Sequence, residues 1–279
     1  MADIRRFIDE TQTMGICVLF SFWRIISYYC SLNQCNPIPL ADFCRKYIFF
    51  INDRCQILSN EDFLKVLLED YHTSRFSGEN DTPNIPGIIK NNTIATDDID
   101  NSSRDVVEFL TASVFHYYCQ HMENNIRGYQ HIAWLAEQMR CGLFLPVRDW
   151  SALNVIDVPI GDYIENEILG HLDADENAFV MFFTSLNSAS GHSRVLCKYN
   201  NQYYVGDPND KRFKKLADHE EFCLKQKQPY LPFSINGGNS ITECLFVSDS
   251  PIVEDTPKTG SVSSSVSGAG PSDSLDMQI

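Results

Sequence analysis

The hydrophobic pattern changes between the first and second halves of the chain, and this change constrains the fold more than any other feature of the sequence. Before residue 142, long segments carry apolar residues at helical spacing, and the stretch 16–29 contains neither glycine nor proline. Beyond it, short runs rich in Val, Phe, Tyr and Leu are bounded by turn residues. Helical segments followed by short strands are typical of an α+β fold. We therefore expect an N-terminal helical part packed on a C-terminal antiparallel sheet.

The helices and strands that this pattern predicts can be placed by residue range. The predicted helices cover residues 16–29, 40–51, 60–71, 104–122 and 127–142. The predicted strands cover residues 142–147, 178–185, 193–199, 202–207 and 243–248. Asn60 precedes two acidic residues, which is a common signature of a helix start.

Two segments differ in composition from the rest of the chain. Residues 77–104 are polar, acidic and rich in turn residues, so we expect a long surface insertion there. Residues 249–279 are rich in Ser, Gly and Pro and contain no aromatic residue, which predicts a disordered tail. The remaining residues, 1–248, are expected to form one folded domain.

Charge and hydropathy exclude several classes of partner. The 279-residue chain has a formal net charge of −15, and an acidic surface repels both nucleic acid and anionic membranes. The apolar run at residues 16–30 is shorter than the roughly 20 residues that a membrane span needs, and Arg24 lies within it. No secretory signal is evident at the N-terminus. We expect a monomer that is cytoplasmic on synthesis and does not span a membrane.

The cysteine and histidine spacings indicate neither a disulfide framework nor a metal site. Ten cysteines occur without any CxxC pair, which is typical of free thiols in a reducing compartment. No HExxH pattern occurs, and His116 and His121 are five residues apart, on different faces of a helix. We therefore expect no metal and no cofactor.

The segment GHSRVLCKYNNQYYVGDPN, residues 191–209, predicts a hairpin with chemistry at its open end. An Asn-Asn turn separates two short strands; His192 opens the first strand and Asp207 closes the second. An aspartate beside a histidine can orient the imidazole and stabilise its charged form, and such an imidazole commonly serves a nucleophile.

Cys17 is the best candidate for that nucleophile. It begins the first apolar helix after Gly15, and the N–H groups at the start of a helix favour a thiolate. Gln12, five residues earlier, could supply a side-chain amide that binds the oxyanion of a carbonyl under attack.

The order of these residues resembles that of the papain-like cysteine hydrolase superfamily. The matching segments are QTMGICVLFSFW for Gln12 and Cys17, GHSRVL for His192, and YYVGDPN for Asp207. An aspartate in the third place, instead of asparagine, is similar to bacterial virulence effectors of this superfamily. The resemblance implies a papain-like fold, a Cys-His-Asp triad and a protein substrate in a host cell, reached through a specialised secretion system.

The chemistry that follows from this resemblance has more than one outcome. A triad of this kind hydrolyses a peptide or isopeptide bond, or it deamidates or transglutaminates a glutamine side chain of a host protein. An acyltransferase would use the same residues. A non-catalytic interaction protein on the same scaffold would bury an inert Cys17 and bind a basic partner through the acidic segment 77–104.

Overall fold

The computed structural model describes residues 15–32, 38–73, 83–122, 128–138, 143–144, 169–174, 178–183, 192–216 and 230–235. The helices are α1 (Cys17–Leu32), α2 (Leu40–Cys55), α3 (Glu61–His72), α4 (Thr96–Asp100), α5 (Arg104–Tyr117), α6 (Gly128–Gln138) and α8 (Leu169–Ala174). Single turns of 3₁₀ or π helix are η2 (Ile57–Ser59), η3 (Pro86–Ile88) and η4 (Tyr118–Met122). The strands are β1 (Ile89–Lys90), β2 (Thr93–Ile94), β3 (Leu143–Phe144), β4 (Ala178–Phe183), β5 (Ser193–Tyr199), β6 (Gln202–Gly206), β7 (Lys214–Lys215) and β8 (Tyr230–Ile235).

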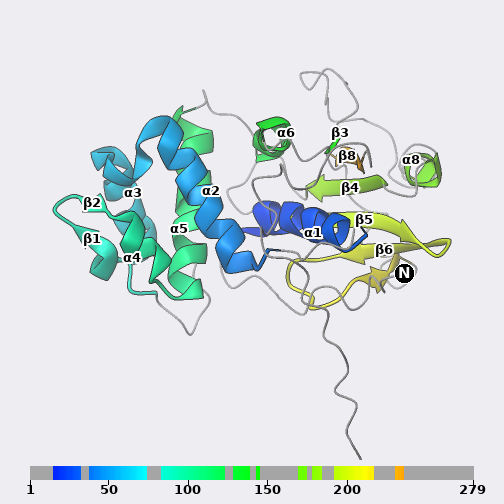
Figure 1. Cartoon of the computed structure of the whole chain (residues 1–279), viewed down its shortest axis with the longest axis horizontal. Coiled ribbons are helices and arrows are strands. Elements are labelled where there is room, and N and C mark those ends of the chain that lie inside the picture. Colours follow the sequence, from blue (N-terminus) through cyan, green and yellow to red (C-terminus); the bar gives the residue numbers. More distant parts are fainter. Residues whose placement is uncertain are drawn as a thin grey trace, which may run out of the picture.

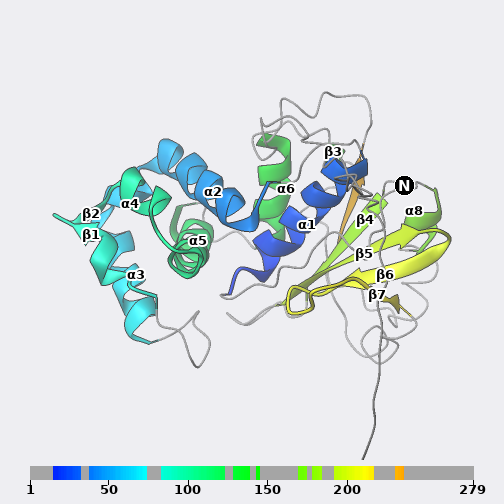
Figure 2. The same ribbon diagram turned by 60° about the horizontal axis from the view of Figure 1, so that its bottom comes forward.

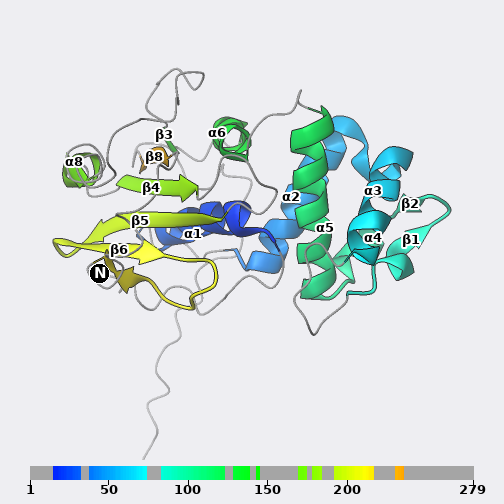
Figure 3. The same cartoon turned by 180° about the vertical axis from the view of Figure 1, so that it is seen from behind.

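Helices from the first half of the chain pack on an antiparallel sheet from the second half, which confirms the expected α+β class (Figure 1). The sheet has the strand order β3-β8-β4-β5-β6-β7, in which β8, β4, β5 and β6 are the longer strands. Seen from behind, α2 to α5 form a helical group on one side of the molecule, and the sheet lies on the other (Figure 3).

Helix α1 lies between these two parts (Figure 2). It contacts α2 and α6 on one side and strands β4 and β5 on the other. Its described side chains are almost all buried, including the polar Ser21, Arg24 and Ser27. A helix that is apolar on nearly every face is stable in water only when it is surrounded, so α1 is the centre of the core.

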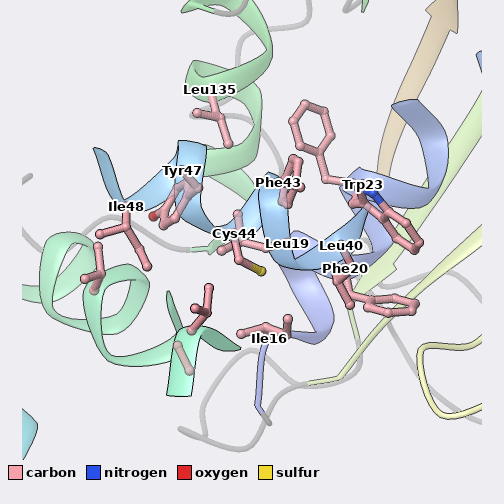
Figure 4. Packing of buried hydrophobic residues seen from close by; sticks show 14 of the residues in the cluster. Ile16, Leu19, Phe20, Trp23, Leu40, Phe43, Cys44, Tyr47, Ile48 and Leu135 are labelled. Atoms are coloured by element: carbon pink, nitrogen blue, oxygen red, sulfur yellow. The ribbon is translucent and has the colours of Figure 1, made fainter. Parts of the chain in front are cut away.

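The main hydrophobic cluster joins α1 to α2 and to the helices behind them (Figure 4). Leu19, Phe20 and Trp23 of α1 pack near Phe43 and Cys44 of α2. The indole Nε1 of Trp23 donates a hydrogen bond of 2.8 Å to the carbonyl of Ile38, which satisfies the polar atom of that buried ring.

The start of α3 agrees with the sequence prediction. The side-chain oxygen of Asn60 accepts hydrogen bonds from the backbone N–H groups of Asp62, at 2.9 Å, and Phe63, at 3.0 Å. These bonds satisfy two of the donors that every helix leaves unpaired at its N-terminus.

The described part of the polar segment, residues 83–104, is anchored to the helical group. Its polar side chains face outward, but four isoleucines are buried: Ile85, Ile88, Ile94 and Ile99. Arg45 of α2 donates hydrogen bonds to the carbonyls of Ile99, at 3.3 Å, and Ser102, at 2.9 Å. The overall composition of this segment is polar, but its isolated isoleucines are buried and join the segment to the core.

Two strands of the sheet, β7 and β8, have no counterpart in the predicted set. Strand β8 lies between β3 and β4 and contains Pro232, which is paired with Val180. Proline lacks the N–H that a ladder needs and argues against an interior strand, so the sequence gives a weak signal here. The predicted strand 243–248 and the predicted tail 249–279 lie outside the described residues.

Arg24 explains the charge in the middle of the first apolar helix. Its side chain is fully buried, and its guanidinium donates to the backbone carbonyls of Asp207, at 2.6 Å, and Asp210, at 2.5 Å. The guanidinium also lies over the rings of Phe20, at 4.7 Å, and Phe213, at 5.6 Å from the centroids. Arg24 therefore ties α1 to the turn that follows β6.

We expect Arg24→Leu to lower the free energy of unfolding by about 3 kcal/mol or more, because one buried and one partly buried carbonyl lose charged donors. Urea denaturation measures this change. Arg54→Leu is the matched control, since Arg54 is exposed and stacks on Phe50 and Trp134; its loss should cost within about 1 kcal/mol. Equal losses in the two variants would show that the Arg24 bonds contribute little.

Candidate active site

The hairpin of β5 and β6 places His192 and Asp207 in contact. Asn200 and Asn201 both have positive φ angles, 48° and 56°, which make the tight two-residue turn that the sequence predicts. This turn fixes the register, in which Tyr199 pairs with Gln202 and Val195 pairs with Gly206. The imidazole Nε2 of His192 lies 2.9 Å from Oδ1 of Asp207.

Asp207 is held by the turn that it begins. The N–H of Asp210 donates to the carbonyl of Asp207 at 2.9 Å, and the N–H of Asn209 donates to Oδ1 of Asp207 at 2.9 Å. Pro208, in the second position of this turn, has the fixed φ that such a turn needs. Asp207 therefore serves the turn through its carbonyl and through Oδ1, and Oδ1 is also the atom that contacts His192.

Gly206 is required at the end of β6 by a close approach. A Cβ at this position would lie 2.7 Å from the ring of Phe213, well inside normal contact distance. Phe213 is buried, and its ring lies beside the guanidinium of Arg24. The glycine thus allows the chain after the turn to fold back over the strand. There it reaches Arg24, whose bonds to the carbonyls of Asp207 and Asp210 form a clamp on the turn.

Arg194 is a residue of the site that the sequence analysis missed. The hairpin register, continued by one pair, puts Arg194 directly opposite Asp207, and its Nε donates to Oδ2 of that carboxylate. His192 is two residues earlier on the same face of the strand, so it meets Asp207 diagonally. The sequence does contain a signal for Arg194: counting residue pairs outward from the Asn-Asn turn places it opposite Asp207.

Cys17 arrives at this site from the other end of the chain. It is the first residue of α1, and its side chain is hydrogen-bonded to His192. Because Nε2 of His192 is bonded to Asp207, the ring nitrogen that remains for Cys17 is Nδ1. The structure thus brings together three of the four predicted site residues, whereas Gln12 lies outside the described residues.

His192 is poised to carry a positive charge. Burial lowers the pKa of His192, but hydrogen bonds to Asp207 and Cys17, together with the charges of these groups, outweigh it and raise the pKa to about 9. At neutral pH the ring is therefore mostly imidazolium, whereas a free histidine, with a pKa of about 6.5, is mostly neutral.

Asp207 is held in its charged form. Burial raises the pKa of its carboxyl, but hydrogen bonds from His192, the N–H of Asn209 and Arg194 outweigh this effect and hold the pKa well below its usual range. A carboxylate in this state only accepts hydrogen bonds, so Nε2 of His192 carries the proton in their contact. This assignment leaves Nδ1 as the nitrogen that gains or loses a proton.

Three other described cysteines lie in surroundings that favour the neutral thiol. Burial raises the pKa values of Cys44, Cys55 and Cys197. Cys17 is also mostly covered, with 7% of its surface exposed, which the interaction-protein alternative would expect. Its hydrogen bond to His192 is the feature that this alternative does not require.

The described histidine at position 131 belongs to the core. His131 is fully buried against the rings of Phe115, Tyr118 and Trp134, and its Nε2 lies 3.0 Å from the hydroxyl of Tyr47. Burial lowers its pKa to about 3, so it stays neutral. Within the described ranges, no three His, Cys, Asp or Glu side chains come together in a group that could bind a metal ion.

No protein-family model, curated protein or solved structure matches this chain. None of the helices in the part of the chain that the structure describes has the length and apolar content needed to cross a bilayer.

We expect Asp207→Asn to lower the pKa of His192 by about 1–3 units, because the imidazolium loses the negative charge bonded to it. Titration of the histidine Cε1–H resonances by NMR measures the change, with His192→Gln identifying the signal. Asp210→Asn removes the same charge three residues away, where the carboxylate is bonded to Lys214, and should leave the His192 pKa close to 9. The contact with Asp207 would be unimportant if both variants titrated alike.

Proposed function

We propose that this protein is a cysteine-dependent hydrolase that cleaves amide bonds of protein substrates, with Cys17, His192 and Asp207 as a triad of the papain-like type. The observation that carries the proposal is His192, which is bonded to a carboxylate at Nε2 and to the thiol of Cys17. A nucleophile, a base and a group that orients the base are the parts that acyl transfer through cysteine requires.

The arrangement of secondary structure supports the same proposal. Cys17 is at the N-terminus of a buried helix, and that helix packs against the sheet whose neighbouring strands hold His192 and Asp207. In the papain-like superfamily, a helix that carries the nucleophile packs on an antiparallel sheet in this manner. The helix N-terminus also favours the negative charge of a thiolate.

The first half of the reaction forms a thioester. The thiolate of Cys17 attacks the amide carbonyl carbon, an S–C bond forms, and the carbonyl π electrons move to oxygen. The N–H of Cys17 belongs to the first turn of α1, whose N–H groups have no partner within the helix, and we assign it as a donor to this oxyanion. The imidazolium of His192 gives its Nδ1 proton to the amide nitrogen, the C–N bond breaks, and the amine leaves.

The second half returns the enzyme to its starting state. Neutral His192 takes a proton at Nδ1 from a water molecule, whose oxygen attacks the thioester carbonyl. The S–C bond breaks, and Cys17 leaves as a thiolate beside the restored imidazolium. Asp207 keeps the proton on Nε2 throughout, so that Nδ1 serves as acid in the first half and as base in the second.

We expect Cys17 to react with iodoacetamide well below a pH of roughly 8.5, near which an ordinary thiol ionises, because the imidazolium stabilises the thiolate. His192→Ala should suppress this reaction at low pH. Peptide mass spectrometry of partly alkylated protein measures it. Cys55, which is half-buried and whose Sγ donates to the carbonyl of Ile51 at 3.2 Å, serves as the reference thiol in the same digest. A Cys17 profile that matches Cys55, with and without His192, would contradict the proposal.

The bond that is cleaved can then be identified with the Cys17→Ala variant as the blank. Incubation with a cell extract should create new protein N-termini that the variant does not create, as found by N-terminal labelling and mass spectrometry. Conversion of glutamine to glutamate without new N-termini would instead assign deamidation to the same triad. If wild type and variant give the same peptides although Cys17 is highly reactive, the triad does not act on the proteins of that extract.

A further inference from the structure

The carboxylate of Asp207 is bound at both oxygens. Oδ1 accepts from Nε2 of His192 and from the N–H of Asn209, each at 2.9 Å, and Oδ2 accepts from Nε of Arg194. The donors come from the start of β5, from the turn and from the face of β5. Asp207 and Arg194 are both largely covered, with 10% and 21% of their side chains exposed.

The bond from Arg194 adds something that the two bonds to Oδ1 do not provide. A carboxylate turns easily about its Cβ–Cγ bond, because that torsion has a broad energy profile. Bonds to one oxygen hold that atom but leave the plane of the group free to tilt. A planar guanidinium on the second oxygen fixes the plane as well as the position.

We propose that Arg194 is a positioning residue, which holds the carboxylate of Asp207 in the plane where Oδ1 meets Nε2 of His192. The proposal deepens the function proposed above and rests on it for its catalytic meaning. The geometric part, that Arg194 orients Asp207 toward His192, concerns residues of the hairpin alone.

Arg194 is also a positive charge near the imidazolium, and this effect has the opposite sign. A spectator cation repels the imidazolium, so its removal raises the pKa of His192. A positioning cation keeps the stabilising carboxylate in place, so its removal lowers that pKa. The other charged or titratable groups at the site come from α1, namely Cys17 and Arg24, and from the turn, namely Asp210 with Lys214.

The test is the pKa of His192 in Arg194→Gln, measured by NMR titration. We expect a fall of about one unit, a tenfold loss of proton affinity, because the shorter neutral side chain no longer reaches Oδ2. Lys198→Gln is the matched control: Lys198 is on the same strand and loses the same charge, but its partner is Asp173. The positioning role would be overturned if the His192 pKa rose or stayed the same in Arg194→Gln while Lys198→Gln left it unchanged.

A double-mutant cycle with Asp207→Asn sharpens the result. If Arg194 acts through Asp207, Arg194→Gln lowers the His192 pKa only while the carboxylate is present. If Arg194→Gln does not fold, Arg194→Lys replaces it: the charge stays but the planar donor is lost, and the pKa should fall by a smaller amount. A pKa equal to that of wild type in the lysine variant would show that any nearby cation suffices and would also overturn the proposal.

Repeating the titration in Cys17→Ser separates the two proposals. There the thiol is absent, yet Arg194→Gln should still lower the His192 pKa, since Asp207 and His192 remain. An inert Cys17 in wild type together with this fall would reject the hydrolase and keep the positioning role. A reactive Cys17 without the fall would do the reverse.

Discussion

The bond between Arg24 and the carbonyl of Asp207 is the interaction on which the site depends. The two residues are 183 positions apart in sequence, and one belongs to the central helix while the other belongs to the turn after β6. Burial lowers the pKa of the Arg24 guanidinium to about 10, against the influence of the Asp207 and Asp210 carboxylates, so it remains charged at neutral pH. Cys17 and Arg24 lie two turns apart on α1, so the clamp that holds the turn also sets where the thiol meets His192.

The turn after β6 therefore has several contacts to satisfy: with α1, with β5 and with the ring of Phe213. The carbonyl of Asp207 faces α1 and its carboxylate faces β5, while Gly206 keeps the space that Phe213 fills. The carbonyl of Asp207 has a structural role, whereas its Oδ1 accepts both from the N–H of Asn209 in the turn and from His192. A substitution at Asp207 that keeps the backbone intact can change the chemistry without removing the clamp, because the clamp uses the main chain.

The sequence predicts the fold class, the helix starts and the hairpin because these depend on local patterns. Asn60 caps α3 and the Asn200–Asn201 turn sets the hairpin register, as their residue types suggest. The contact of Cys17 with His192 was expected because a thiol at a helix start is a suitable nucleophile for an oriented histidine, and a resemblance in residue order agreed with that choice. Strand β8 and the buried isoleucines of residues 83–104 escaped prediction, because isolated apolar residues and a strand proline give no periodic signal. Arg24 was visible as a charge in an apolar helix, but its partners are backbone carbonyls, which a sequence cannot display.

The distance in sequence between Arg24 and its carbonyl partners also sets the order of events on the ribosome. At about 5–20 residues per second, the turn at 207–210 is synthesised roughly ten to forty seconds after Arg24 leaves the peptidyl-transferase centre. During that interval an almost wholly apolar helix with a charge in its middle has no sheet to cover it. Cys17 cannot meet His192 until the strands of the sheet have emerged, so a chain interrupted before the hairpin carries a thiol but no paired imidazole.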